Sequence, residues 1–361
     1  MLHAVDIVKL FIPLTTSFVI GMLLTPLLTN FLYKNEMWKK KAGKIAPDGR
    51  ETPIFNELHK DREVGTPKMG GIIIWVSATI TIVGFWFIAR LFPIASIRKF
   101  DFLSRSQTLI PLCTLVFGAL VGLADDYLDI SGSKNQISTG LSFKKRVVVV
   151  GLIALLCALW FYIKLGVSTI GLPYHHAIPL GIFFVPFFIL VVIGLYSGGV
   201  IDGLDGLAGG VFAAMYASYG GIAFYQHQID LAAFCAVIAG GTLAFLWFNV
   251  PPARFYMSET GSMSLTVTLA VVAFMTDSLA GGYGILVLPV IALPLVITSL
   301  SVIIQLTSKK LRHGKKVFKV APFHHDLEAR GWPSYTVTMR YWIISTIVAG
   351  LGLILAIIGQ G

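Results

Sequence analysis

The stretch YSGGVIDGLDGLAGG, residues 196–210, lies between two long apolar runs and carries two carboxylates among six glycines. These carboxylates belong to Asp202 and Asp205, which stand three residues apart. On a helix, that spacing places both side chains on one face, so the pair would aim at a single point. Acids at the mouth of a membrane segment are costly to keep unless something binds them. A solvated loop that leads into a helix is the alternative interpretation of the same residues.

The apolar runs around this stretch continue along the whole chain. Of the 361 residues, 56% are hydrophobic and only 13% are charged, which is far from the composition of a soluble domain. Ten segments come close to the ~20 residues that a helix needs to cross a bilayer. They run roughly 7–33, 69–92, 108–125, 147–165, 178–196, 205–225, 231–248, 262–280, 284–306 and 340–358. The sequence therefore predicts an all-α, polytopic membrane protein with about ten transmembrane helices in a single domain, residues 1–361.

The positive charges are distributed unevenly among the predicted loops. Of the 28 Lys and Arg residues, 22 lie in the loops after the odd-numbered spans, at 34–68, 127–146, 249–261 and 307–340. Because cytoplasmic loops carry the excess of Lys and Arg, we expect these loops in the cytoplasm and both termini outside. The net charge of +10 follows from this topology. The sequence contains no soluble basic domain with aromatic residues that could stack on bases, so nothing in it indicates a nucleic-acid partner.

The segment GLADDYLD, residues 122–129, ends the third predicted span with two adjacent acids, Asp125 and Asp126. Neighbouring residues on a helix diverge by about 100°. We therefore expect the two acids to play different parts, one near a metal or phosphate and one on a proton. Solvation at a helix end is the alternative, although acids at a helix C-terminus oppose its dipole.

Cations follow in LSFKKR, residues 141–146, where Lys144 and Arg146 open the fourth span. They are candidate contacts for a phosphate on a ligand or a lipid headgroup. The alternative is that they only supply the positive charge of a cytoplasmic loop.

The segment NVPPARFYMSETGS, residues 249–262, combines an amide, two aromatics and an acid, and its Pro pair excludes a straight helix. Glu259 offers carboxylate oxygens suited to Mg²⁺, which usually takes one or two carboxylates plus substrate phosphates. Together with the loop 197–204, this segment is expected to line the cytoplasmic site.

Paired histidines, His324 and His325, lie beside an acid in the basic segment HGKKVFKVAPFHHDLEARGW, residues 313–332. Their spacing does not match a zinc site. Histidine can donate to phosphate oxygens or move protons near neutral pH, so both residues are candidates for the same site.

These groups together indicate phosphoryl transfer between a soluble phosphate ester and a membrane lipid. The acids would hold a divalent metal, and the metal and cations would spread the developing charge. A non-catalytic lipid-phosphate-binding protein or transporter is the alternative from another class. Transporters usually carry charges or broken helices at mid-membrane and show internal repeats, whereas Asp and Glu are absent from the middle of the predicted spans. The sequence therefore favours an enzyme.

The chain also resembles a known family in five motifs, in the same order and over nearly its whole length. These are GTPKMGG (65–71), GLADDYLD, DGLDGLAGG (202–210), FNVPPARFYMSETGS and APFHHDLEARGW. They are similar to motifs of the bacterial phospho-MurNAc-pentapeptide translocases, a branch of the polyprenyl-phosphate N-acetylhexosamine-1-phosphate transferases. The resemblance implies transfer of phospho-MurNAc-pentapeptide from UDP-MurNAc-pentapeptide to undecaprenyl phosphate in peptidoglycan biosynthesis, giving lipid I and UMP with Mg²⁺ as cofactor. It implies the bacterial inner (cytoplasmic) membrane as location and leaves a homodimer open.

The resemblance implies roles for individual side chains, with Asn249 expected at the uridine and Tyr256 stacked on uracil. The predicted catalytic residues are Asp125, Asp126, Asp205, His324 and His325. The predicted substrate-binding residues are Asp202, Asn249, Tyr256, Lys144, Arg146 and Lys68. The predicted metal ligands are Glu259 and Asp205.

Several positions depart from the family's usual pattern. In the run before DGLDGLA, where the family usually has Asn, this chain has Tyr196 and Gly199. Glu259 stands where the family has a shorter acid, and Asp326 where it has a third His. The family usually has basic residues just before Gly-Thr-Pro, whereas this chain has Glu63 and Val64 there. A related transferase that uses another UDP-HexNAc donor is therefore an alternative to the MurNAc-pentapeptide reaction.

Overall fold

The computed structural model describes residues 4–40, 43, 64–92, 94–104, 106–132, 140–174, 176–278 and 281–359. Much of the predicted loops 34–68 and 127–146, including Glu63, lies outside these ranges. The helices are α1 Ala4–Lys34, α3 Ile72–Leu91, α4 Ala95–Arg98, α5 Leu109–Ser131, α6 Phe143–Leu159, α7 Phe184–Ser197, α8 Leu207–Tyr225, α9 Ile229–Asn249, α10 Ser258–Ser278, α11 Gly284–Ile291, α12 Leu293–Leu311, α13 Phe323–Ala329 and α14 Ser334–Ile358. Two short strands, β1 Thr169–Leu172 and β2 His176–Pro179, pair as an antiparallel hairpin.

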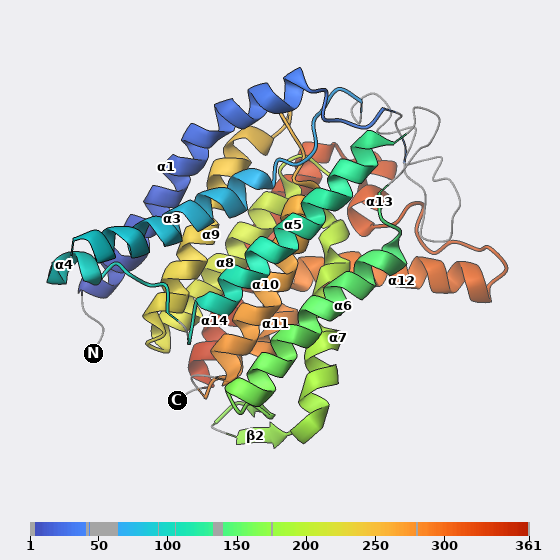
Figure 1. Cartoon of the computed structure of the whole chain (residues 1–361). Coiled ribbons are helices and arrows are strands. Elements are labelled where there is room, and N and C mark those ends of the chain that lie inside the picture. The colour runs from blue at the N-terminus through green and yellow to red at the C-terminus, as the bar shows by residue number, and fades with distance from the viewer. Residues whose placement is uncertain are drawn as a thin grey trace.

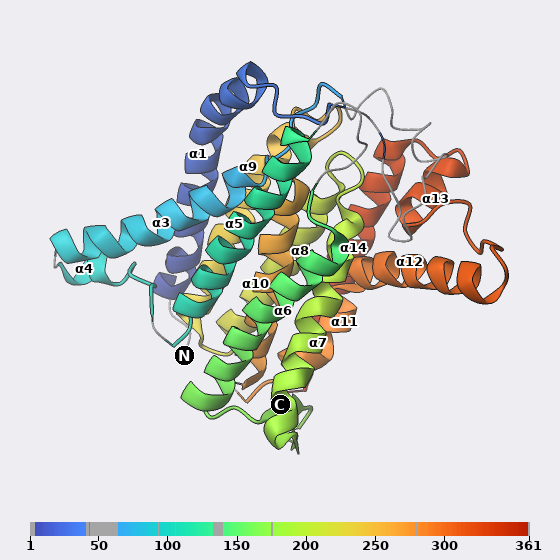
Figure 2. The same ribbon diagram turned by 45° about the vertical axis from the view of Figure 1, so that its right-hand side comes forward.

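Nine helices in the described part of the chain are long and apolar enough to cross a membrane, and the bent pair α11–α12 makes a tenth candidate. The predicted all-α class with about ten spans is thereby confirmed. The ninth predicted span, 284–306, is not straight, because α11 and α12 meet at 69°. Pro294 stands at the start of α12 and has no N–H with which to continue the bonding of α11. As a result, α12 points sideways out of the bundle (Figures 1 and 2).

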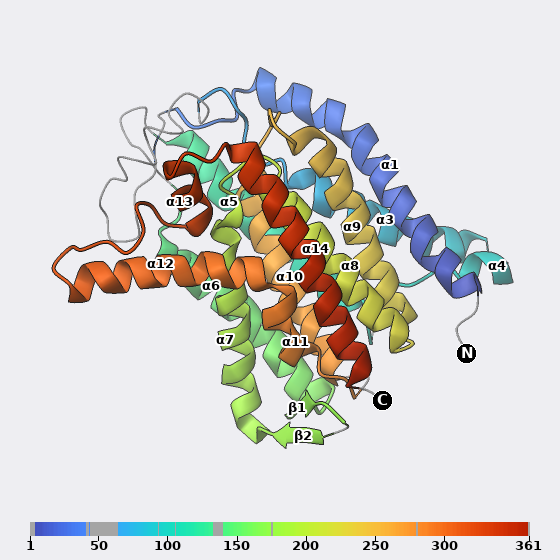
Figure 3. The same cartoon turned by 180° about the vertical axis from the view of Figure 1, so that it is seen from behind.

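Helix α10 occupies the centre of the bundle, with α5, α7 and α8 among the helices around it (Figures 1 and 3). In its most apolar window, 94% of α10 is buried, against 17% of α1. Glycines let the neighbouring segments approach the start of this helix closely. A Cβ added at Gly122 on α5 would lie 2.2 Å from the carbonyl oxygen of Glu259, and one at Gly71 would lie 2.3 Å from the nitrogen of Gly261.

The two ends of the bundle differ. Both chain termini lie toward the end that carries the β1–β2 hairpin, whereas α13 and the last turns of α5 lie at the other end (Figures 1 and 3). Every predicted site residue lies at this second end, because α5 finishes there and α6, α8 and α10 begin there.

Gly122→Ala should destabilise the protein by forcing α5 away from α10. Overpacking a tight contact typically costs ~1–3 kcal/mol, so we expect a lower midpoint of thermal unfolding in detergent. Gly84→Ala on α3 is the control, because a Cβ there would meet nothing within 4 Å. Equal midpoints for the two variants would contradict the close approach of α5 and α10.

Candidate active site

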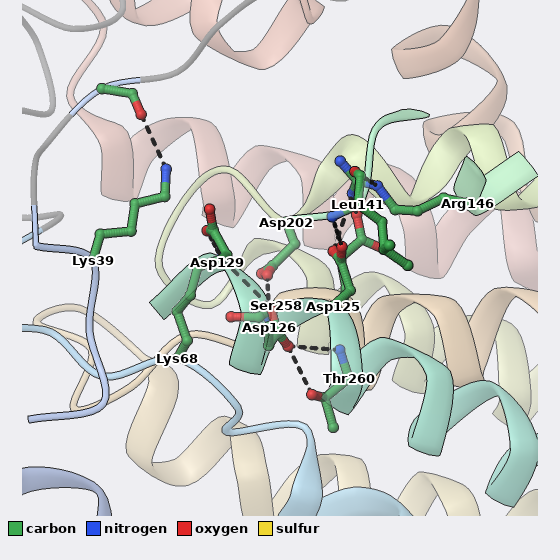
Figure 4. A network of polar contacts seen from close by, with 12 residues as sticks. Lys39, Lys68, Asp125, Asp126, Asp129, Leu141, Arg146, Asp202, Ser258 and Thr260 are labelled. Atoms are coloured by element: carbon green, nitrogen blue, oxygen red, sulfur yellow. Dashed lines mark hydrogen bonds and ion pairs between the residues drawn. The ribbon is translucent and has the colours of Figure 1, made fainter. Parts of the chain in front are cut away.

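Asp126 lies near the end of α5 and joins this helix to two other segments. Its Oδ2 accepts hydrogen bonds from the backbone N–H of Thr260 at 2.9 Å and from the Thr260 hydroxyl at 2.7 Å. Its Oδ1 lies 3.4 Å from Nζ of Lys68 (Figure 4). The side chain is 0% exposed, so the alternative of a solvated helix-end acid does not hold for Asp126.

Asp125 points to a different set of partners. Its Oδ1 accepts the backbone N–H of Leu141 at 2.5 Å, and its Oδ2 lies 3.6 Å from Nη1 of Arg146. The two neighbouring acids therefore face separate groups (Figure 4). This confirms the divergence expected from their adjacent positions on one helix.

Arg146 connects the first acid of α5 with the acid of α10. Its Nη1 donates to Oε1 of Glu259 while it also lies near Asp125. The Tyr196 hydroxyl donates to Oε2 of Glu259 at 3.4 Å. One guanidinium from α6 thus lies between two carboxylates of separate helices. Lys144, which was also predicted to bind substrate, is exposed and takes no part in these contacts.

Lys68 comes from the loop before α3 and reaches the same acids from the other side. Its Nζ lies 2.6 Å from Oδ2 of Asp129, one helical turn beyond Asp125 and Asp126. Burial by itself would lower the pKa of Lys68, but the charges of Asp126 and Asp129 outweigh it and raise the pKa above its usual range. The ammonium is therefore charged at neutral pH.

Asp129 is a residue that the sequence reasoning missed. It belongs to GLADDYLD and stands three and four residues after the acid pair, which places it on a neighbouring part of the same helix face. That spacing was the available signal, but its partner Lys68 is 61 residues away in the chain. Only the tertiary structure brings them together.

Asp202 and Asp205 do not share a helical turn, so that expectation is wrong. Residues 202–206 form turns between a 3₁₀ segment, Gly198–Ile201, and the start of α8 at Leu207. Gly206 has φ of 76°, a left-handed conformation that glycine adopts easily and that interrupts the helix. Oδ2 of Asp202 accepts the N–H of Ser258 at 2.7 Å, and Oδ2 of Asp205 accepts the N–H of Ala253 at 3.2 Å.

Asn249 ends α9, and its side chain forms hydrogen bonds with two loops of the site. Its Oδ1 accepts the N–H of Gly206 at 3.0 Å, and its Nδ2 donates to the carbonyl of Phe255 at 2.8 Å. The side chain is buried, so Asn249 positions these loops. Tyr256, in the second loop, is half-buried, and its backbone bonds to Pro67 and Gly70 at 2.8 Å each.

His324 and His325 are buried on α13, with ring centroids 4.3 Å apart. A Cβ added at Gly203 would lie 2.5 Å from Nε2 of His324 and 2.6 Å from Nε2 of His325. Both rings therefore lie against the loop of Asp202 and Asp205. Nδ1 of His325 lies 2.7 Å from a carboxylate oxygen of Glu328, which fixes the orientation of the ring.

Asp326, where the family pattern has a further histidine, holds the surrounding loop. Its Oδ1 accepts the N–H of Lys319 at 2.8 Å, and its Oδ2 pairs with Nε of Arg330 at 2.6 Å. The side chain is fully buried. Its role in the structure is therefore to support α13 beneath the two histidines.

The donor set at this end of the bundle suits a hard divalent cation. The described residues include no cluster of three or more His, Cys, Asp or Glu side chains arranged around one point for a metal. Mg²⁺ does not need such a cage, because it is usually bound by one or two carboxylates and completed by phosphates and water. Glu259 fits as such a ligand, since its carboxylate is 24% exposed and already faces a cation, Arg146. Asp205 lies on a separate loop with a different partner.

Comparison with known proteins shows which family the chain resembles. Residues 108–277, from the start of α5 to the end of α10, match the family model described as glycosyl transferase family 4. A phospho-N-acetylmuramoyl-pentapeptide-transferase of Listeria monocytogenes is 32% identical over 344 residues, which cover 95% of this chain and 94% of the relative. One of Chloroflexus aggregans is 29% identical over 366 residues, which cover 98% of this chain and 91% of the relative.

The spans and these relatives define a polytopic membrane transferase, in which residues 108–277 match glycosyl transferase family 4. Within that class, the chain belongs to the family of the phospho-N-acetylmuramoyl-pentapeptide-transferases. The similarity to these relatives extends over the whole site, including the histidines of α13, which lie beyond the region matched by the family model.

Asp125→Asn and Asp126→Asn should produce different defects. Asparagine at 126 would set an NH₂ group among donors of Thr260 and Lys68, and an unmade buried hydrogen bond costs ~1–3 kcal/mol. We expect Asp126→Asn to lower the unfolding midpoint and raise KM, and Asp125→Asn mainly to lower kcat. Steady-state kinetics and thermal unfolding measured on the same preparations would separate the two. Identical changes in kcat, KM and midpoint would contradict separate roles.

Asp129→Asn should weaken the hold on Lys68, whereas Asp129→Glu should keep it. The raised pKa means that the pairing stabilises the fold fully below the unfolded pKa of ~10.4 and loses this effect only as pH rises through the folded value. We therefore expect a lower unfolding midpoint for Asp129→Asn throughout pH 6–9. Its kcat/KM should fall roughly tenfold, the equivalent of ~1.4 kcal/mol. A midpoint and kcat/KM like those of the unaltered protein would show that Asp129 does not position Lys68.

Proposed function

We propose that the protein transfers phospho-MurNAc-pentapeptide from UDP-MurNAc-pentapeptide to undecaprenyl phosphate, giving lipid I and UMP. The observation that carries this proposal is the convergence of acids and cations from separate segments at one end of the bundle. Asp125 and Asp126 come from α5, Arg146 from α6, Glu259 from α10 and Lys68 from the loop before α3. Membership of a transferase family whose named relatives act on phospho-N-acetylmuramoyl-pentapeptide supports the choice of donor.

The cations of the site would bind the phosphates of both substrates. Arg146 can form two parallel hydrogen bonds to a phosphate, which are stronger and more directional than neutral ones. To do so it would exchange its contact with Glu259 for one with the substrate. Lys68 would add a second positive charge, because Asp126 and Asp129 keep its ammonium charged.

The acids and histidines would handle protons and orientation. Asp125 is the candidate base for the lipid phosphate, since its Oδ2 lies 3.6 Å from the Arg146 guanidinium, which is too far for a hydrogen bond, whereas both oxygens of Asp126 accept hydrogen bonds from Thr260 or Lys68. His324 and His325, beside the loop of Asp202 and Asp205, would face the phosphates of the donor. Asn249 keeps that loop in place and would thereby shape the uridine side, where Tyr256 would stack on the base.

Mg²⁺ is part of the proposal, with Glu259 as its principal ligand and Asp205 as the second acid. When bound, the ion would polarise the phosphoryl oxygens and offset the charge that develops on them. Glu259 would then hold the ion in place of Arg146, and the guanidinium would turn to Asp125 or to the substrate.

We further propose that the site faces the cytoplasm and that both termini lie outside. The support is the excess of Lys and Arg in the loops at the site end. A reporter fused to the C-terminus that works only in the cytoplasm would disprove this orientation. The bilayer supplies undecaprenyl phosphate laterally, and a homodimer is compatible with the exposed apolar faces of the outer helices.

The departures from the family pattern support a second candidate function, transfer from another UDP-HexNAc. Gly199 has no side chain, and a Cβ there would meet only Ser262 and Thr266 at ordinary contact distances of 3.6 Å and more. The glycine leaves room where a larger residue could contact a donor. A non-catalytic lipid-phosphate-binding protein would use the same cations but would release no UMP.

The decisive experiment supplies purified protein with UDP-MurNAc-pentapeptide, undecaprenyl phosphate and Mg²⁺ and follows UMP release. We expect release only when all three are present, and its loss when EDTA removes the metal. UDP-GlcNAc is tested in parallel. Faster release from UDP-GlcNAc would establish the second candidate, and no release from either donor would support a binding protein.

Glu259→Gln should abolish nearly all activity, because the charge that holds the ion is gone. Glu259→Asp should lose most of it as well, since Mg²⁺ demands short and nearly octahedral ligation and the shorter acid does not reach. Turnover at several Mg²⁺ concentrations tests both variants. Normal turnover and normal Mg²⁺ dependence in Glu259→Gln would transfer the metal to another acid of the site.

A further inference from the structure

The loop between α3 and α5 concentrates positive charge at the end of the bundle opposite the active site. Six Lys and Arg residues lie outside the predicted cytoplasmic loops, and four of them stand between residues 90 and 105. In the same interval Asp101 is the only acid. This charge runs against the general distribution, in which Lys and Arg are concentrated at the other end, so topology does not explain it.

A cavity of about 270 Å³ lies at this loop, lined by Ala89, Arg90, Arg98 and Asp101. Arg90 lies in the last turn of α3, and its guanidinium lies 5.5 Å from the centre of the Trp86 ring, which orients it. Arg98 ends the short helix α4. The carboxylate of Asp101 accepts the N–H of Leu103 at 3.2 Å. Two arginines and one partly engaged carboxylate therefore line the cavity, and this excess of positive charge favours an anion.

Aromatic packing fixes the shape of the loop that forms the cavity. The ring of Phe85 on α3 stacks on Phe100 with centroids 6.0 Å apart and also contacts Phe102 at 6.2 Å. Phe102 is buried, and its carbonyl accepts a hydrogen bond of 2.7 Å from the hydroxyl of Thr108. The segment that carries Arg98 is thus anchored against α3 on one side and against the start of α5 on the other.

Exposed apolar side chains lie next to the lining residues along the chain. Phe87 and Leu91 on α3 and Phe92 and Ile94 beyond it are each 54–56% exposed. They belong to the end of a membrane span, where exposed apolar groups contact acyl chains and the adjacent cations reach the headgroups. A ligand for both surfaces needs a phosphate joined to hydrocarbon.

We propose that the cavity between Arg90 and Arg98 binds the phosphate of an anionic phospholipid at the membrane surface opposite the active site. The guanidiniums would donate charge-assisted hydrogen bonds to the phosphate oxygens, and the acyl chains would lie along Phe87, Leu91 and Phe92. The inference does not depend on the proposed transfer reaction, because it uses none of the residues of the active site.

Native mass spectrometry of the detergent-solubilised protein tests this site with phosphatidylglycerol as the probe. We expect adducts with phosphatidylglycerol in preference to phosphatidylcholine, and a roughly tenfold loss of these adducts in the double variant Arg90→Gln, Arg98→Gln, since charge-assisted hydrogen bonds are removed. Arg98→Lys, which keeps the charge, should retain part of the binding. Inorganic phosphate in millimolar excess should displace little lipid.

Lys164→Gln is the control for the loss of positive charge in the double variant. Lys164 is exposed at the same end of the bundle, after α6, and lies away from the cavity. Its loss should leave the adducts unchanged. Equal adducts in the double variant and the unaltered protein would overturn the proposal. So would displacement of the lipid by inorganic phosphate, which would assign the cavity to a soluble anion. UMP release by the double variant, measured separately, reports on the transferase and not on this site.

Discussion

The active-site end of this protein depends on one buried carboxylate, that of Asp126. Its oxygens accept the backbone and hydroxyl donors of Thr260 and face the ammonium of Lys68, so three segments meet on a single side chain. A buried charge is stable only when it is paired and hydrogen-bonded, and here both conditions are met. Glycine at 122 allows the close helix approach that the short bonds require. The positions of Asp125, Arg146 and Glu259 follow from this junction.

Much of this could be predicted from the sequence, because hydrophobic length and local polar motifs are properties of contiguous residues. The spans follow from apolar runs, and the divergence of Asp125 and Asp126 follows from helical geometry alone. The non-helical course around Pro251 and Pro252 follows from the missing N–H of proline. Membership of the family was visible in motifs that lie far apart in the chain. Each span and each motif is a property of residues that are contiguous in the chain, so the sequence alone shows it.

The remainder depends on contacts between distant segments. Asp129 belongs to the site because it pairs with Lys68, which lies far from it in the chain. Arg146 connects two helices because it pairs with Glu259, which lies 113 residues later. The spacing of Asp202 and Asp205 suggested a helix, but Gly206 in a left-handed conformation turns the chain, and the two acids accept hydrogen bonds from different backbone groups of the neighbouring loop. The bend between α11 and α12 was hidden in a continuous apolar run, because hydropathy records length and not direction. In each case, tertiary hydrogen bonds or backbone geometry outweighed the local pattern.

The composition of α10 has a consequence for how the chain enters the membrane. This helix is the most buried span and is rich in Ser and Thr, and its mean hydropathy of 1.2 compares with 2.0 for α1 and 2.4 for the span that begins with α6. Partitioning into lipid is more favourable for a more apolar helix. By itself, α10 therefore leaves the translocation channel for the bilayer less readily than its more apolar neighbours. Several of its hydroxyls bond to its own backbone, as Thr266 does to Ser262 at 2.7 Å, and its close contact with Gly122 exists only when α5 is already present. The helix that carries Glu259 is thus retained in the bilayer by the helices inserted before it.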